Sequence, residues 1–381
     1  MAIRRRGKDA WYITVDLPRD PLTGKRRRAF MTARTKREAE REEARLKHRT
    51  ATGIDLEPGR LTLAEYLNRW LDTMQPNLTP NTHKRYASVL ANQVIPRLGA
   101  TQLTKLRPIH IQQLHTDLRT KGRMDGAGGL AQKTILQIHR ILSEAMKHAV
   151  GLQLISQNPC QLVRAPQVRP KELATLSRDE ARSLVAAAEA ADSIYADSII
   201  LALHTGMRMG ELRGLKWEDI NLEEGRLVVR RALQHVHAIG FVLQQPKTPN
   251  SRRTIPLGAT PVEALRRQRK RQVEDRLLLG PDYREPELVF ASVVGTPIFP
   301  GNLRRAFENL LKAAGCPRIR FHDLRHTHAS LLLARGVHPK VVSERLGHAS
   351  IVITLDTYSH LMPTMQEEAV KEFDAWLAGR A

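Results

Sequence analysis

Residues 205–217 read TGMRMGELRGLKW and place an arginine just beyond the expected end of a helix. Residues 193–204 before them are predicted to form a buried helix, and Gly206 is of the type that ends helices. Arg208 then follows at a helix junction, from which a side chain can project into a cleft. A single arginine in such a place is more often a surface charge, here a salt-bridge partner of Glu211. Arg208 is therefore a functional candidate only in combination with other residues.

Three further polar clusters lie C-terminal to this stretch, and no packing pattern explains them. Residues 245–257 read QPKTPNSRRTIPL, residues 322–330 read HDLRHTHAS, and residues 346–360 read LGHASIVITLDTYSH. In the second cluster, His322 and Arg325 stand three positions apart and so share one face of a helix. The candidates in the three clusters are, in chain order, Lys247, His322, Arg325, His348 and Tyr358.

Taken singly, these residues also have plain structural interpretations. Lys247 lies beside a Pro-Asn-Ser turn, which we expect on a hairpin between strands at residues 236–244 and 252–257. Alone it would be a turn lysine, and Tyr358 alone would more often be a packing residue.

A metal site or a nucleotide site is not expected. His322, His326 and His328 could be metal ligands, but HDLRH is not HExxH, and no carboxylate or cysteine constellation completes a site. Residues 121–130, KGRMDGAGGL, lack the Gly-Lys-Ser/Thr of a phosphate-binding loop. We therefore expect no metal, no cofactor and no requirement for ATP.

In the four clusters the sequence resembles the tyrosine recombinases, or phage-type integrases, over residues 172–381. The active site of that family consists of Arg, Lys, His, Arg, His and Tyr in this order. Agreement at all six positions, each in its own motif, outweighs the single interpretations above. The resemblance implies the catalytic residues Arg208, Lys247, His322, Arg325, His348 and Tyr358.

The resemblance also implies a role for each residue. Tyr358 would be the nucleophile that forms a 3′-phosphotyrosyl bond, with His322 as its base, because a tyrosine needs one near neutral pH. Lys247 would give a proton to the leaving 5′ oxygen. The two arginines would neutralise the non-bridging oxygens, and His348 would hydrogen-bond to the phosphate.

The whole chain fits a partner that is a polyanion. Its 381 residues include 61 Lys and Arg against 39 Asp and Glu, a formal net charge of +22, and 41% of the residues are hydrophobic. Such a charge indicates nucleic acid most simply, although an anionic membrane surface would also fit it. No apolar run reaches the ~18 residues of a membrane span. We expect a soluble, cytoplasmic protein without a membrane partner.

The fold class expected is multidomain and mainly α with small β-sheets. The resemblance implies an arm-type DNA-binding domain over residues 1–55 with a three-stranded sheet and a helix, a helical, SAM-like core-binding domain over 61–163, and a mixed α+β catalytic domain over 172–381. Capping boxes are expected at Thr62–Glu65 and at Ser177–Glu180. Helices are expected again from about residue 302 onward.

The N-terminal residues are strongly basic. Residues 10–17 and 25–32 alternate as strands do, and a capping box at Thr35 predicts a helix over residues 36–47. The alternative is a solvated basic tail with accidental alternation. If the segment folds, its basic residues could lie in a DNA groove. These DNA-binding candidates are Arg4, Arg5, Arg6, Lys25, Arg26, Arg27 and Arg28.

The function expected is that of an integrase, which would join a mobile element such as a prophage to a host site. Its partners would be double-stranded DNA at attachment sites and either an excisionase or a host DNA-bending protein. Residues 362–377 have helix periodicity, and they would either pack on their own domain or dock on a neighbour in a homotetramer. The alternatives are a chromosome or plasmid dimer resolvase, a type IB topoisomerase and a non-catalytic DNA-binding scaffold.

Overall fold

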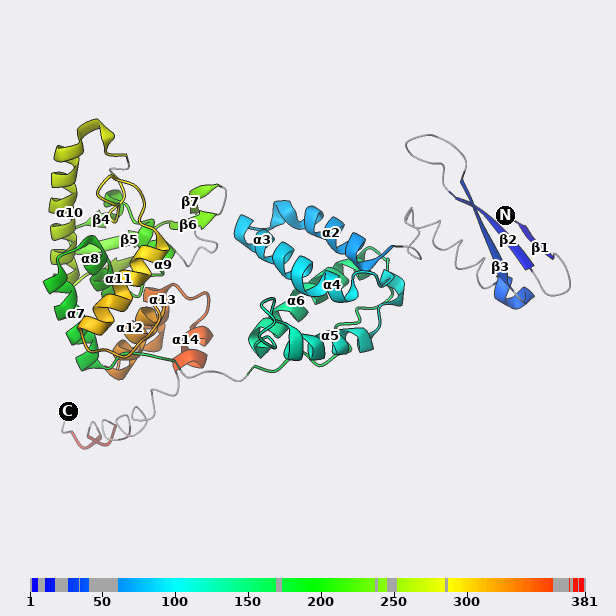
Figure 1. Ribbon diagram of the computed structural model, residues 1–381. Helices are drawn as coiled ribbons and strands as arrows, with labels where there is room; N and C mark the ends of the chain where they lie inside the picture. The colour runs from blue at the N-terminus through cyan, green and yellow to red at the C-terminus, as the bar shows by residue number, and fades with distance from the viewer. Residues whose placement is uncertain are drawn as a thin grey trace. The chain divides into compact units, whose positions relative to one another are not determined.

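The structure is a computed structural model, in which the chain divides into two units, Met1–Arg169 and Pro170–Ala381 (Figure 1). Of the predicted site residues, Arg6, Lys25, Arg26 and Lys247 lie outside the described residues, and so does most of the segment 362–377. The described residues are 2–5, 11–17, 27–33, 35–40, 61–168, 173–236, 239–244, 252–284, 287–358, 370, 373–375 and 377–379.

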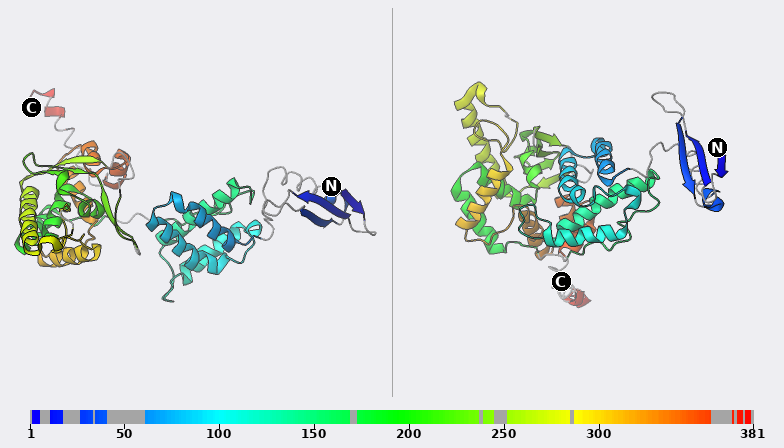
Figure 2. Two further views of the ribbon diagram at one scale, coloured as in Figure 1. Left: turned by 90° about the horizontal axis from the view of Figure 1, so that it is seen from above. Right: turned by 45° about the vertical axis from the view of Figure 1, so that its right-hand side comes forward.

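The first unit begins with a three-stranded antiparallel sheet, in which β2 lies between β1 and β3 (Figure 2). The strands are β1 (Ala2–Arg5), β2 (Trp11–Leu17) and β3 (Arg27–Ala33). Residue alternation alone predicts only the last two, because β1 is too short to show a pattern and is defined by its pairing with β2. Arg4 and Arg5 lie on β1, and Arg27 and Arg28 lie on β3.

The rest of the described part of this unit is helical. The capping box predicted at Thr62 is present: the Thr62 N–H donates to Glu65 Oε2 at 2.8 Å, and the Glu65 N–H donates to Thr62 Oγ1 at 3.3 Å. The helix that follows it buries an apolar face, with Tyr66, Leu67 and Trp70, in the core. The helices are α2 (Leu63–Met74), α3 (Pro80–Val89), α4 (Ile95–Leu98), α5 (Pro108–Lys121) and α6 (Gln132–Gly151).

The second unit is built around the buried helix α8 (Ile194–Thr205). Most of its residues are buried, and α7, α10, α11 and α12 pack around it. As predicted, α8 ends at Gly206, which adopts φ +65°. The other helices of this unit are α7 (Arg178–Ala191), α9 (Met209–Arg213), α10 (Ala259–Leu279), α11 (Pro300–Ala313), α12 (Asp323–Ala334), α13 (Pro339–Leu346) and α14 (Ile351–Tyr358).

The predicted hairpin between residues 236–244 and 252–257 is wrong. Two separate small antiparallel sheets are present instead, because Gly240, at φ +91°, helps to turn the chain inside the first expected strand. β7 pairs with β6, whereas β8 pairs with β5. Lys247 itself lies outside the described residues. The strands are β4 (Ile220–Asn221), β5 (Arg226–Val229), β6 (Ala232–Val236), β7 (Gly240–Gln244) and β8 (Arg253–Pro256).

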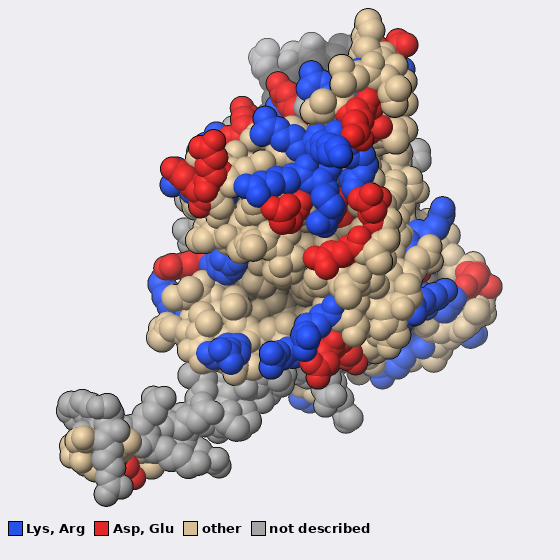
Figure 3. Space-filling model, turned by 90° about the vertical axis from the view of Figure 1, so that its left-hand side faces the viewer, with Lys and Arg blue, Asp and Glu red and all other residues tan. Residues whose placement is uncertain are grey.

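The long helix α10 is not predicted by the hydrophobic pattern, because glutamines form part of its buried face. Gln268 Nε2 donates to the Val289 carbonyl at 3.0 Å, and Gln272 Nε2 donates to the Leu288 carbonyl at 2.8 Å. The outer face is rich in arginine, and Figure 3 shows Lys and Arg side chains gathered on this side of the unit, with acidic side chains among them. Arg267 is paired with the buried Asp197 of α8 at 2.7 Å.

The fold class predicted from the sequence, mainly helical with small sheets and several domains, is confirmed. Within the described parts of the chain, no helix combines the length and the apolar character needed to cross a membrane.

Candidate active site

A cavity of about 790 Å³ in the second unit brings the predicted catalytic residues together. Its walls come from α9, β6, α12 and the residues around α14. A larger hollow of about 950 Å³ lies elsewhere, against α7, and contains none of the candidates that the structure describes. The candidates that line the 790 Å³ cavity are Arg208, His322, Arg325, His348 and Tyr358.

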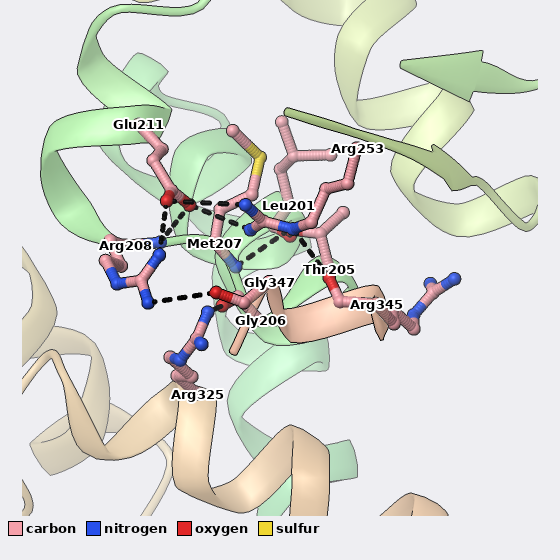
Figure 4. A network of polar contacts seen from close by, with 10 residues as sticks. All are labelled: Leu201, Thr205, Gly206, Met207, Arg208, Glu211, Arg253, Arg325, Arg345 and Gly347. Atoms are coloured by element: carbon pink, nitrogen blue, oxygen red, sulfur yellow. Dashed lines mark hydrogen bonds and ion pairs between the residues drawn. The ribbon is translucent and has the colours of Figure 1, made fainter. Parts of the chain in front are cut away.

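Glu211 connects two arginines at one side of this cavity (Figure 4). Its Oε1 lies 2.7 Å from Arg208 Nη1, and its Oε2 lies 2.8 Å from Arg253 Nη2. Burial alone would raise the pKa of Glu211, but the hydrogen bonds and charges of Arg253 and Arg208 outweigh burial and lower it. The ionised carboxylate therefore holds both guanidinium groups. The salt bridge suggested as the ordinary interpretation of Arg208 is present, and it fixes Arg208 in the cavity wall.

Arg325 is a buried cation whose hydrogen-bonding capacity is only partly used. Its side chain is 3% exposed, and Nη1 donates to the Gly206 carbonyl at 2.9 Å. Its Nη2 is buried and has no partner among the described residues. Burial, and then the charges of Arg208 and Arg253, lower the pKa of Arg325 to about 9. A buried guanidinium with an unused donor, beside other cations, favours the binding of an anion.

Backbone carbonyls at the C-terminal end of α13 hold Arg208 and Arg253 in place. Gly347 ends α13 at φ +66°, and its carbonyl lies 3.5 Å from Arg208 Nη2. Arg253 Nε donates to the carbonyl of Arg345 at 2.7 Å. The αL turn at Gly347 also determines where the next residue, His348, enters the cavity.

Tyr358 is hydrogen-bonded to a histidine that the sequence did not indicate as catalytic. Its hydroxyl lies 2.7 Å from His326 Nδ1, and the ring of His322 lies next to that of His326, with 5.2 Å between the centroids. Burial raises the pKa of Tyr358 to about 12, while Arg325 acts in the opposite direction. Burial and then His322 lower the pKa of His326 to about 4. At neutral pH the phenol therefore donates and the neutral imidazole accepts.

His348 is neutral at pH 7 for the same reason. Burial, followed by the charges of Arg325 and Arg208, lowers its pKa to about 4. Its Nδ1 lies 2.8 Å from Thr354 Oγ1, which leaves Nε2 for a ligand. Among the residues that the structure describes, no group of three or more His, Cys, Asp or Glu is arranged to hold a metal ion.

The depressed histidine pKa values predict a loss of stability in acid. In the unfolded chain a histidine has a pKa of ~6.5, whereas in the fold His326 and His348 have pKa values of about 4. Between these two pH values the unfolded chain binds protons that the folded chain does not, so the free energy of unfolding rises with pH across this window. The thermal unfolding midpoint should fall as the pH drops from 6.5 to 4.5. A His326→Gln, His348→Gln double variant should show a shallower fall, and an equally steep one would contradict this assignment.

The residues that sequence reasoning missed are Glu211, Arg253 and His326. Each had a local signal, because Glu211 stands three positions after Arg208, Arg253 lies in the Lys247 cluster, and His326 stands one turn after His322. Nothing local showed that these side chains meet the candidates.

Comparison with known proteins gives a consistent result. The phage integrase family matches residues 174–365, and the SAM-like N-terminal domain of phage integrases matches residues 62–119. A "Tyrosine recombinase XerC-like" protein of Caldanaerobacter subterraneus subsp. tengcongensis is 30% identical over 386 residues and covers 96% of either chain. The ICEBs1 integrase of Bacillus subtilis is 25% identical and covers 98% of this chain and 99% of its own.

Solved structures share the fold. The Tn1549 transposon integrase in complex with a circular intermediate DNA matches with a TM-score of 0.67 at 21% identity, over 82% of this chain and 99% of that one. A lambda integrase tetramer bound to a Holliday junction matches with a TM-score of 0.56 at 22% identity, over 93% of this chain and 94% of that one.

Proposed function

The chain belongs to the phage integrase family, and we propose on that basis that it is a tyrosine site-specific recombinase, an integrase that cuts and rejoins DNA through a 3′-phosphotyrosyl intermediate. One observation carries the proposal: Arg208, Arg325 and Tyr358, up to 150 positions apart in sequence, line one cavity with neutral histidines. A scaffold that only binds DNA has no need of a buried tyrosine hydrogen-bonded to an imidazole.

The first step is an attack on phosphorus. Tyr358 Oη forms a bond to the scissile phosphorus while the bond from phosphorus to O5′ breaks. The phenolic proton passes to His326 Nδ1, its hydrogen-bond acceptor. The leaving O5′ takes a proton, for which Lys247 is the proposed source. Arg208 and Arg325 neutralise the charge that develops on the non-bridging oxygens.

Rejoining is the same step in reverse. The 5′-hydroxyl of another strand gives its proton to Lys247 and attacks the phosphorus of the phosphotyrosyl bond, and Tyr358 leaves with the proton returned from His326. Because one phosphate ester replaces another, the exchange needs no ATP. His348 Nε2 is proposed to hydrogen-bond to the phosphate, with Thr354 fixing the ring through Nδ1.

The partner proposed for this chemistry is double-stranded DNA at attachment sites. Similar proteins are described in complex with DNA and as a tetramer on a Holliday junction, and we propose the same kind of assembly here. The segment 362–377 would dock between neighbours in a homotetramer. Residues 1–55 are proposed to bind arm-type sites, and their presence favours an integrase over a dimer resolvase. An excisionase or a host DNA-bending protein would set the direction.

The test of the proposed function is the trapping of the intermediate. Double-stranded DNA with a candidate site is nicked just 3′ of the scissile phosphate, so that the short leaving strand diffuses away. Incubation in EDTA, followed by electrophoresis in SDS, should reveal a covalent adduct of protein and DNA, since the arginines supply the positive charge. Complete absence of the adduct on every candidate site would refute the proposal.

A pair of variants distinguishes the two candidate bases. His326→Gln should slow adduct formation by about 10²-fold or more, because a general base contributes about 10²–10⁴-fold. The wild-type rate of adduct formation should change little between pH 6 and 9, since the pKa of His326 is about 4 and that of Tyr358 is about 12. The His326→Gln rate should rise with pH, because hydroxide must then form the phenolate.

The matched variant is His322→Gln, on the same helix face one turn away. It should keep the level pH profile of the wild type. If His322→Gln instead shows the rising profile and His326→Gln does not, His322 is the base and the hydrogen bond from Tyr358 to His326 is only structural.

A further inference from the structure

Arg213 is a second buried arginine in the wall of the catalytic cavity. It is the last residue of α9, and Arg208, which also lines the cavity, is the N-cap of the same helix. Its side chain is 3% exposed, and Nε donates to the Ile298 carbonyl at 2.7 Å. The guanidinium lies over the ring of Phe241, 5.3 Å from the centroid. Its Nη2 is buried and has no partner within the described residues.

Arg304 of α11 lines the same cavity and adds a second unneutralised charge. Burial, and then the charge of Arg304, lower the pKa of Arg213 to about 10, so the two guanidinium groups repel each other. No salt bridge is found for either among the residues that the structure describes. Arg231, by contrast, also lines the cavity and is paired with Glu218 at 2.6 Å and Asp219 at 2.7 Å.

Arg213 shares its burial, its place in the cavity wall and its unpartnered Nη2 with Arg325. Leaving a cation buried without a counter-charge costs free energy unless an anion compensates for it. Since Arg325 is proposed to bind the scissile phosphate, Arg213 has the properties of a site for another phosphate.

We propose that Arg213 and Arg304 form a second phosphate subsite, which binds the phosphodiester next to the scissile one on the same strand. The subsite rests on the proposed function, because it needs a DNA strand in the cavity. Arg208, Arg325 and Arg213 all line one cavity, so a DNA strand lying in it would meet the second pair of arginines beside the first. The second contact would hold the scissile phosphate in position for attack.

The test pairs arginine variants with single neutral phosphates. Six nicked site DNAs are prepared, each with a single methylphosphonate at one of the three phosphates on either side of the scissile one. The rate of adduct formation is measured on each. For the wild type, one adjacent position should slow the reaction about tenfold or more, as expected for loss of a charge-assisted hydrogen bond. Arg304→Met and Arg213→Met should be slowed to a similar extent on unmodified DNA. On the DNA with the neutral phosphate at that position, the rate of adduct formation of either variant should fall little further.

Arg305→Met is the matched control, because Arg305 is the next residue on α11 and does not line the cavity. It should keep the wild-type sensitivity to the neutral phosphate. If Arg304→Met and Arg213→Met are as sensitive as the wild type at every position, the subsite is wrong. Arg304 is exposed, so its variant tests the proposal even if Arg213→Met does not fold. Failure of the wild type to react with unmodified DNA would instead refute the proposed function, and the subsite with it.

Discussion

Tyr358→Phe is expected to abolish the covalent adduct with nicked site DNA. The substitution removes the only atom of the side chain that can attack phosphorus, and the loss should exceed about 10³-fold, because no other tyrosine among the described residues lines the cavity. DNA affinity should stay within about twofold, since binding depends mainly on contacts between basic side chains and phosphates. Adduct formation is followed by electrophoresis in SDS, and affinity by a mobility shift at fixed salt.

Tyr283→Phe is the matched control for this variant. Tyr283 is also buried in the second unit, and its hydroxyl accepts a hydrogen bond from Gln272 Nε2 at 2.8 Å. Its loss should lower stability by about 1 kcal/mol and leave adduct formation intact. An adduct that persists in Tyr358→Phe would show that another residue is the nucleophile.

Arg325→Lys is expected to produce the second largest loss, about 10²–10³-fold in the rate of adduct formation. Lysine keeps the positive charge but lacks the planar fork that reaches both the Gly206 carbonyl and a phosphate oxygen. The ammonium would also be buried among Arg208 and Arg253, where those charges favour its neutral form. The measurement is the single-turnover rate with nicked DNA.

Arg318→Lys makes the same chemical change on the surface, where Arg318 is paired with Glu308. It should leave the rate unchanged, because an exposed ion pair contributes little. If Arg325→Lys reacts at the wild-type rate, charge alone is sufficient at this position, and the planar fork that reaches both the Gly206 carbonyl and a phosphate oxygen is not needed.

Local sequence signals predicted the parts of the fold that depend on neighbours along the chain. The capping boxes at Thr62 and Ser177 and the end of α8 at Gly206 are present, because each needs only a few consecutive residues. Local sequence signals failed where the hydrogen-bond or packing partner of a residue lies far away along the chain. The buried face of α10 uses Gln268 and Gln272, which look solvent-exposed in the sequence but bond to carbonyls of a distant segment.

The sheets show the same limit. Residues 236–244 and 252–257 look like two arms of a hairpin, yet β7 and β8 pair with other strands. Pairing of strands depends on which edges are available in the folded unit, and alternation along one strand contains no information about that.

The sequence by itself determined the family and the residue types of the candidate site, because six chemically suitable residues in a fixed order, each in its motif, seldom occur together by chance. Only the tertiary structure decided which groups meet. It placed His326, and not His322, against Tyr358, and it made Glu211 the common partner of Arg208 and Arg253. Helix spacing fixes the face on which a side chain lies, but the packing of α12 against α14 decides which of two histidines one turn apart reaches the tyrosine.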